Sequence, residues 1–180
     1  QLPEVEVDTH GNLVFQEVMN SVTHGLGLAL AVVGTVFLAI RAHGRGRVHV
    51  WATAIYASSL CTLFLSSTLF HSFFAIQSAY RIFNVLDMCA IYILIAGSYT
   101  PFLCIGLRQQ TVWSMWMLIF LWCCCAFGIA TEAFLRNHQL KRRLAIGLCL
   151  AMGWAAVLPL PDLLGVLEWR GVLFLVLGGL

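Results

Sequence analysis

Residues 111–131, TVWSMWMLIFLWCCCAFGIAT, decide the fold class of this chain. The stretch contains no charged side chain. It is long enough to cross a hydrocarbon core of about 30 Å as a helix that rises about 1.5 Å per residue. Because a helix satisfies its own backbone hydrogen bonds inside a bilayer, the stretch predicts a transmembrane helix.

The composition extends this prediction to the whole chain. Of the 180 residues, 61% are hydrophobic and 10% are charged, and the mean hydropathy is +0.89. A soluble domain carries about 25% charged residues, so this chain lacks the polar surface of a water-soluble protein. The net charge of +2, without basic runs interleaved with aromatic residues, gives no reason to expect a nucleic-acid partner. We therefore expect a multi-pass integral membrane protein surrounded by membrane lipid, in a membrane that the sequence does not specify.

Apolar blocks predict the number and order of the spans. They lie at about residues 22–40, 48–71, 82–104, 112–131 and 144–160, and a sixth at 166–180 is incomplete. We interpret residues 1–16 as a polar leader and residues 17–180 as one transmembrane helical domain. The expected fold class is an all-α, polytopic transmembrane helix bundle in which short connections make consecutive helices antiparallel. Because the chain begins at Gln1 and stops within an apolar run, we expect a fragment cut at both ends.

Three polar side chains, Ser67, His71 and Asp87, lie within otherwise apolar spans. The second predicted span ends with Ser67 and His71, and the third begins near Asp87. Antiparallel helices therefore place all three residues near the same membrane face. A bilayer tolerates such groups where they pair, bind a ligand or line a wet cavity. The sequence predicts a polar site assembled from separate helices at this face.

The chemistry of this cluster leaves two interpretations open. Ser67 and His71 are four residues apart and share one helix face, and neutral imidazole is the commonest protein ligand of transition metals. Asp87 could orient a water molecule, act as a base or pair with His71. A zinc site normally needs three protein ligands and a water, or four protein ligands. A structural cluster that clamps the second and third helices is therefore an alternative to a metal site.

A second polar group precedes the first span. Glu17, Asn20 and His24 have i, i+3, i+7 spacing and would share one face of a helix. Such a face suits packing against the polar ends of neighbouring helices, so we expect a structural or supporting role. In an alternative interpretation, Asn20 or Ser21 caps the start of the first span.

Two further features point to packing rather than chemistry. Near the end of the third span, the stretch Gly97-Ser98-Tyr99-Thr100-Pro101 predicts a close helix approach and a kink. The seven cysteines all lie in predicted spans without zinc-finger spacing, so we expect them to act as small apolar side chains.

Three motifs occur in a fixed order along the chain. They are Glu17-x-x-Asn20-Ser-x-Thr23-His24-Gly25, SSTLFHS at 66–72, and Asp87-x-x-Ala90-Ile91-Tyr92 continuing to Pro101. In this order and spacing the chain resembles the hemolysin III family, part of the progestin and adipoQ receptor superfamily of seven-span membrane proteins. The resemblance extends over nearly the whole chain from Glu17. It implies a seven-span bundle, of which the end of span six and span seven are missing from these residues.

The resemblance also implies a zinc ion. In this superfamily Zn²⁺ is held by one histidine at the end of the second span and two in the seventh, and an aspartate at the start of the third span contacts it through water. Carried over, His71 is the zinc ligand, Asp87 is its water partner, and Ser67 lines the site. Asp87 and Ser67 are then the candidate catalytic residues. The two other histidines would lie outside the 180 residues.

Three functions follow from this resemblance. The first is a zinc-dependent hydrolase that acts on a lipid amide, such as a ceramide-like substrate. The second is a receptor or signalling scaffold with a structural zinc ion, whose protein partners the sequence does not identify. The third is the cytolytic, pore-forming activity behind the family's name. A pore needs a continuous polar stripe through several helices, and no such stripe is apparent in the sequence, so we rank this function lowest.

Overall fold

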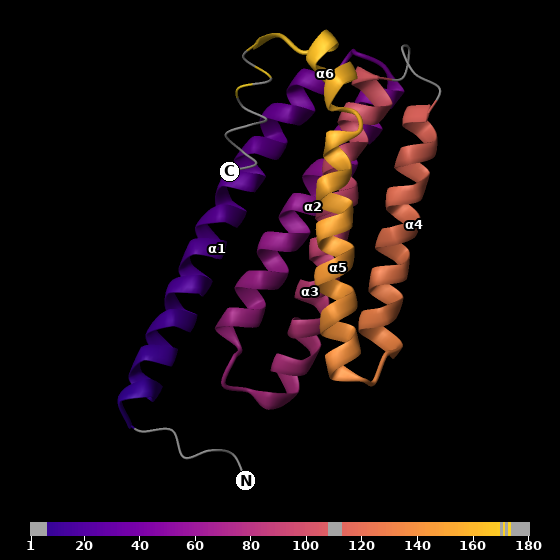
Figure 1. Ribbon diagram of the computed structural model, residues 1–180. Helices are drawn as coiled ribbons and strands as arrows, with labels where there is room; N and C mark the ends of the chain where they lie inside the picture. Colours follow the sequence, from indigo (N-terminus) through magenta and orange to yellow (C-terminus); the bar gives the residue numbers. More distant parts are fainter. Residues whose placement is uncertain (1–6, 108–112, 170, 172, 174–180) are drawn as a thin grey trace.

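A computed structural model describes residues 7–107, 113–169, 171 and 173 of the protein. Within these residues every regular element is a helix. The α-helices are α1 (Val7–Ala42), α2 (Arg47–Ser72), α3 (Gln77–Pro101), α4 (Trp113–Phe134), α5 (His138–Trp154) and α6 (Leu160–Val166) (Figure 1). A π-helical segment, η1 (Phe102–Gly106), continues α3, and a 3₁₀ turn, η2 (Ala155–Val157), follows α5.

Four helical segments are long and apolar enough to cross a membrane. They are Gly11–Ala42, Arg47–Ser72, Gln77–Gly106 and Trp113–Phe134. The segments His138–Val157 and Leu160–Val166 meet the same criterion together, with a bend of 45° between them, and make a fifth span if they cross as one. The expected all-α, polytopic membrane bundle is therefore confirmed, as is a multi-pass location in a membrane.

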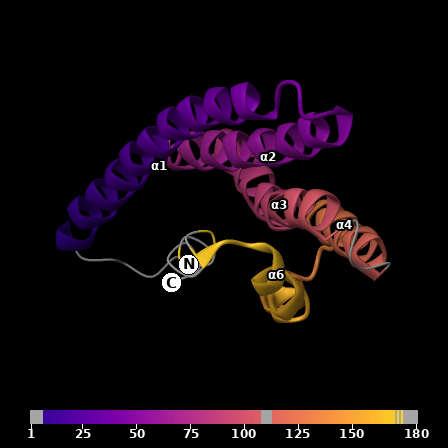
Figure 2. The same ribbon diagram turned by 90° about the horizontal axis from the view of Figure 1, so that it is seen from above.

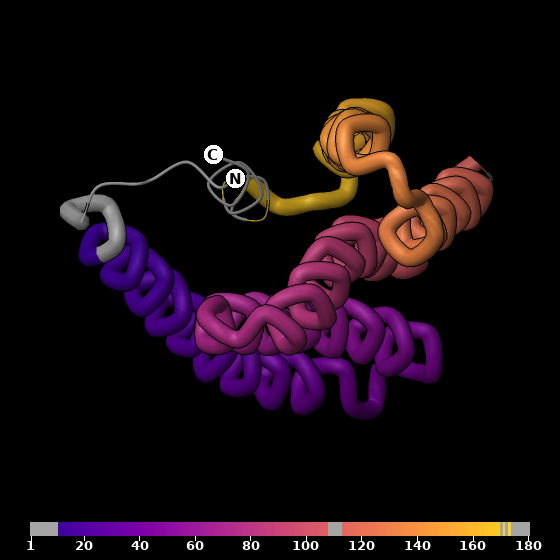
Figure 3. The backbone as a smooth tube through the Cα atoms, turned by 90° about the horizontal axis from the view of Figure 1, so that it is seen from below, coloured from indigo at the N-terminus to yellow at the C-terminus, as the bar shows by residue number. Residues whose placement is uncertain are grey.

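The helices pack mainly in chain order. Each of α1 to α4 contacts the next helix along the chain, and α5 also contacts α3. Viewed from either end, α1 to α4 form a curved row with α5 and α6 on its concave side (Figures 2 and 3). The α2–α3 and α4–α5 connections lie at one end of the bundle with the start of α1, and the α1–α2 connection lies at the other (Figure 1). Consecutive helices are thus antiparallel, as predicted.

Turn residues explain where several helices begin and end. Gly44 and Gly46 have φ values of 79° and 100°, in a region that side chains with a Cβ rarely adopt, and they let the chain reverse between α1 and α2. The side chain of Asn137 accepts a hydrogen bond of 3.0 Å from the Leu140 backbone N–H and caps α5. Pro101 is the last residue of α3, and the π-helical η1 follows it.

The helix boundaries differ from the expected spans at three points. Helix α1 begins at Val7, within the residues interpreted as a polar leader. Because Asn137 provides a cap, α5 begins at His138, six residues before the apolar block. The short helix α6 (Leu160–Val166) occupies the interval between the expected spans at 144–160 and 166–180. Most of the expected sixth span, at 166–180, lies outside the described residues.

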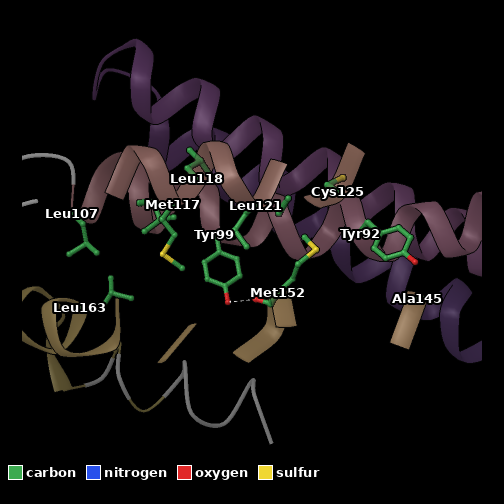
Figure 4. Packing of buried hydrophobic residues seen from close by; sticks show 12 residues of the cluster. Tyr92, Tyr99, Leu107, Met117, Leu118, Leu121, Cys125, Ala145, Met152 and Leu163 are labelled. Carbon is green, nitrogen blue, oxygen red and sulfur yellow. Dashed lines mark hydrogen bonds between the residues drawn. The ribbon is translucent and has the colours of Figure 1, made fainter. Parts of the chain in front are cut away.

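The most buried part of the described structure centres on α3 (Figure 4). Tyr92 and Leu103 of α3 and η1 and Leu121 of α4 are fully buried, and Met152 of α5 is 1% exposed. Glycine makes the close contacts possible. A Cβ at Gly97 would lie 2.8 Å from Ser59 Cβ of α2, and one at Gly128 would lie 2.9 Å from the Tyr92 ring. The predicted close helix approach at Gly97 is therefore confirmed.

The seven cysteines all belong to the described part of the chain, and none of them forms a disulfide. Cys125 is 2% exposed and is part of the buried cluster between α3 and α4. This environment agrees with the predicted use of thiols as packing groups.

Candidate functional site

Polar residues of α1, α2 and α3 come together near one end of the bundle. His71 is in the last turn of α2, Asp87 is in the third turn of α3, and Glu17 and His24 lie along the first half of α1. The sequence predicted that antiparallel helices would place Ser67, His71 and Asp87 near the same membrane face. The three residues do lie near one end of the bundle. We call Glu17, His24, Ser67, His71 and Asp87 the polar cluster.

A short contact joins α1 to α2 in this cluster. Nδ1 of His71 lies 2.6 Å from Oε2 of Glu17, and the two side chains are 16% and 21% exposed. The ring of His24, two turns along α1, stacks on the His71 ring with centroids 5.4 Å apart and planes inclined by 8°. The imidazole of His71 is thus held on one edge by a carboxylate and on one face by a second ring.

A second contact joins α2 to α3. The Ser67 hydroxyl donates a hydrogen bond to Oδ1 of Asp87, and the Ser66 hydroxyl lies 3.5 Å from the same oxygen. Ser66 and Ser67 are buried. The hydrogen bond from Ser67 restricts the rotation of the Asp87 carboxylate, whereas the Ser66 hydroxyl donates to the Leu63 backbone carbonyl at 3.0 Å. In the structure Asp87 pairs with Ser67, whereas His71, which the sequence left as a partner for Asp87, pairs with Glu17.

The pairs lie close together because of helix geometry. Ser67 and His71 are four residues apart on α2, about one turn and a rise of about 6 Å. The carboxylate bound to Ser67 and the imidazole at His71 therefore sit at adjacent levels of one helix face. The polar cluster combines two carboxylates, two imidazoles and a hydroxyl group at one end of the bundle.

Asn20 takes no such part in the cluster, although the sequence grouped it with Glu17 and His24. Its residue is exposed, and its backbone carbonyl accepts a hydrogen bond of 2.9 Å from the Thr23 hydroxyl within α1. The proposed capping by Asn20 or Ser21 does not occur, because α1 is continuous from Val7. The Ser21 hydroxyl instead lies 2.7 Å from the Ser72 hydroxyl and adds a link between α1 and α2.

The polar cluster contains one candidate ligand for a metal ion, His71. Within the described residues, no group of three His, Cys, Asp or Glu side chains is arranged to hold a metal ion. His71, however, has the environment of a single ligand. When Nδ1–H donates to the Glu17 carboxylate, the lone pair of the neutral ring is on Nε2, and metal-binding histidines commonly have a carboxylate partner of this kind.

The structure adds a buried ion pair that the sequence interpretation missed. Glu132, near the end of α4, is 4% exposed. Nζ of Lys141 lies 3.5 Å from its Oε2 and donates a hydrogen bond of 2.9 Å to its backbone carbonyl. The pair joins α4 to α5 at the same end of the bundle as His71. The signal in the sequence was the carboxylate of Glu132, one residue beyond a predicted span. Because the predicted span ended at residue 131, Glu132 was not considered as part of the helix.

The opposite half of the bundle contains an apolar cavity of about 600 Å³. Its walls come from α2, α3, α5 and α6, and include Leu60, Leu94, Ser98 and Leu163. Tyr99, beside this cavity, donates hydrogen bonds of 2.8 and 3.1 Å to the carbonyls of Met152 and Gly153 at the end of α5 (Figure 4 shows the Met152 contact). The Tyr99 hydroxyl thereby ties α5 to α3.

Comparisons with known proteins agree on one family. Residues 13–180 match the family model described as Haemolysin-III related. Hemolysin-3 of Bacillus cereus is 36% identical over 169 residues, which cover 93% of this chain and 74% of that protein. The Hemolysin-3 homolog of Bacillus subtilis is 34% identical over 166 residues, covering 92% and 76%.

A more distant relative comes from animals. The Monocyte to macrophage differentiation factor of Homo sapiens is 29% identical over 149 residues, which cover 80% of this chain and 60% of that protein. No solved structure has significant similarity to the chain.

Proposed function

Because this chain belongs to the haemolysin-III related family, within the progestin and adipoQ receptor superfamily, we propose that it is a zinc-dependent hydrolase of lipid amides, with ceramide-like molecules as the substrate class. The observation that carries the proposal is the contact of 2.6 Å between His71 Nδ1 and Glu17 Oε2. This contact leaves Nε2 of a neutral imidazole for a metal, next to a carboxylate held by Ser67.

In this proposal His71 holds the zinc ion through Nε2, and Glu17 and His24 keep its ring in place. The remaining ligands would come from histidines of a further span, as the family resemblance implies. When bound, zinc lowers the pKa of a coordinated water to about 7 and polarises a carbonyl group.

Asp87 is the proposed base. Its carboxylate accepts the proton of the attacking water, and afterwards returns a proton to the leaving amine. The hydrogen bond from Ser67 keeps the second carboxylate oxygen free for this exchange, because the bond engages Oδ1. Ser67 therefore positions Asp87, and both residues are required for turnover.

The apolar cavity of about 600 Å³ supports a lipid substrate. Ligand sites are mostly apolar clefts of about 300–1,000 Å³ with few polar groups. Ser98 at its wall is eleven residues along α3 from Asp87, a rise of about 16 Å. A lipid whose amide lies at the polar cluster has an apolar space for its chain within that distance.

The test is zinc content and amide hydrolysis by the full-length protein and three variants. His71→Ala should lose zinc and turnover together. Asp87→Asn should keep zinc and lose turnover, because it removes the base and leaves the ligand. The control His43→Ala, in the exposed α1–α2 connection, should change neither.

A second candidate function is a receptor or signalling scaffold with a structural zinc ion. It is favoured by the contacts that join α1 to α2 at the cluster, Glu17 with His71 and Ser21 with Ser72. In this case zinc-loaded wild type releases no fatty acid from a lipid panel, and His71→Ala lowers only the melting temperature. That result would refute the hydrolase.

A further inference from the structure

The connection between α1 and α2 concentrates positive charge at the end of the bundle opposite His71 and Asp87. Its basic residues lie within positions 41–49, a segment without Asp or Glu: Arg41, His43, Arg45, Arg47 and His49. The three arginines are exposed. Among the described residues, the carboxylate contacts of basic side chains join His71 to Glu17 and Lys141 to Glu132, so neither contact uses these arginines.

A cavity of about 460 Å³ lies beside this connection. Arg45, Gly46, Arg47 and His49 line it on one side, and Cys104 and Ile105 of η1 line it on the other. The positive φ values at Gly44 and Gly46 turn the chain tightly here, so the successive basic residues stay at the cavity. It combines cationic groups with an apolar wall, which suits an amphipathic anion.

Helix length places this cavity at the headgroup level of the bilayer. Arg47 and His71 are 24 residues apart on α2, a rise of about 36 Å. The hydrocarbon core is about 30 Å thick, and the headgroup regions lie just beyond it. With His71 near one interface, the cavity at Arg47 is therefore at the other.

We propose that this cavity binds the phosphate headgroup of an anionic phospholipid. Arg45 and Arg47 contact the phosphate, because the planar guanidinium group matches phosphate oxygens in pairs. The apolar wall at Ile105 contacts the glycerol end of the acyl chains. A membrane phospholipid is favoured over a soluble phosphate because the cavity adjoins a membrane-spanning helix at headgroup depth. The site is independent of the zinc chemistry proposed above.

The experiment compares two charge-matched double variants of the full-length protein. R45Q/R47Q removes two positive charges from the cavity, and R142Q/R143Q removes two exposed ones from the start of α5, at the other end of the bundle. Each protein is melted in nanodiscs of phosphatidylcholine with and without phosphatidylglycerol, and bound lipid is counted by native mass spectrometry. We expect R45Q/R47Q to lose the stabilisation and the bound phosphatidylglycerol, and R142Q/R143Q to keep both.

Equal loss in the two variants would overturn the proposal, because surface charge alone would then explain it, and so would no loss in either. Glycerol 3-phosphate added to phosphatidylcholine nanodiscs tests a soluble source. Stabilisation as large as that of phosphatidylglycerol would overturn the lipid assignment. If R45Q/R47Q does not fold, R45K/R47K keeps the charge and removes the planar group. Weaker phosphatidylglycerol binding by R45K/R47K supports the site, and unchanged binding overturns it.

Discussion

The contact between α2 and α3 at Gly97 can be tested by adding one methyl group. In Gly97→Ala the new carbon would lie 2.8 Å from Ser59 Cβ, whereas non-bonded carbons prefer about 3.5–4.0 Å. The two helices must therefore separate by about 1 Å at this level. The same two helices hold Ser67 against Asp87, so the contact also supports the polar cluster.

The size of the effect follows from two opposing contributions. Overpacking a close contact costs about 1–3 kcal/mol, and replacing Gly by Ala in a helix contributes about 0.5–1 kcal/mol of stability. Gly147→Ala supplies the matched control, because an added Cβ at this position in α5 has no neighbour within 4 Å. The two variants should differ by the steric cost alone. A difference of about 2 kcal/mol corresponds to about 4–8 °C in melting temperature for a chain of this size.

The assay is thermal unfolding of the purified protein in detergent, followed by the loss of helical circular dichroism. A second variant isolates the contact, because Ser59→Gly removes the opposing Cβ. In that background Gly97→Ala should become neutral or stabilising. If Gly97→Ala melts with Gly147→Ala, or if Ser59→Gly does not relieve its effect, the steric reasoning is wrong.

Three further predictions address hydrogen bonds; thermal unfolding tests the first two, and calorimetric titration tests the third. Tyr99→Phe removes the hydroxyl that bonds the α5 carbonyls and should lower the free energy of unfolding by about 1 kcal/mol; an unchanged melting temperature would contradict this. Tyr92→Phe should raise the free energy of unfolding by up to about 1–3 kcal/mol, because the Tyr92 hydroxyl is buried without a partner among the described residues. A lower melting temperature would reveal a partner. Glu17→Gln weakens the support of His71 and should lower the zinc affinity of the full-length protein by about 10–100-fold in calorimetric titration; equal affinities would count against the proposed zinc ligand.

The membrane fold could be predicted from the sequence because a bilayer imposes a simple requirement. Each long apolar block must be a helix, and short connections must return the chain to the same side. Four helices that are long and apolar enough to cross a membrane lie at these blocks, and consecutive helices are antiparallel. The apolar pattern located helix ends less well, because an end depends on local hydrogen bonds. The side chain of Asn137 starts α5 before the apolar block begins, and α6 forms where only a connection was expected.

The location of the polar cluster could be predicted from the sequence, but its side-chain contacts could be predicted only in part. The antiparallel order of the spans brings His71, Asp87 and Glu17 to one end of the bundle, and helical periodicity puts Ser67 one turn from His71. Neither rule specifies how each helix is rotated about its axis relative to the next. That rotation leaves Asn20 exposed and brings Glu17 to His71.

The sequence by itself therefore determined the class of protein, the order of its helices and the end at which its polar groups gather, because these depend on hydropathy and chain direction. The tertiary structure decided which side chains pair: Glu17 with His71, Ser67 with Asp87 and Glu132 with Lys141. The physical reason is that pairing depends on the rotation and separation of packed helices. Those quantities are set by contacts between distant residues, such as the close approach of Gly97 to Ser59.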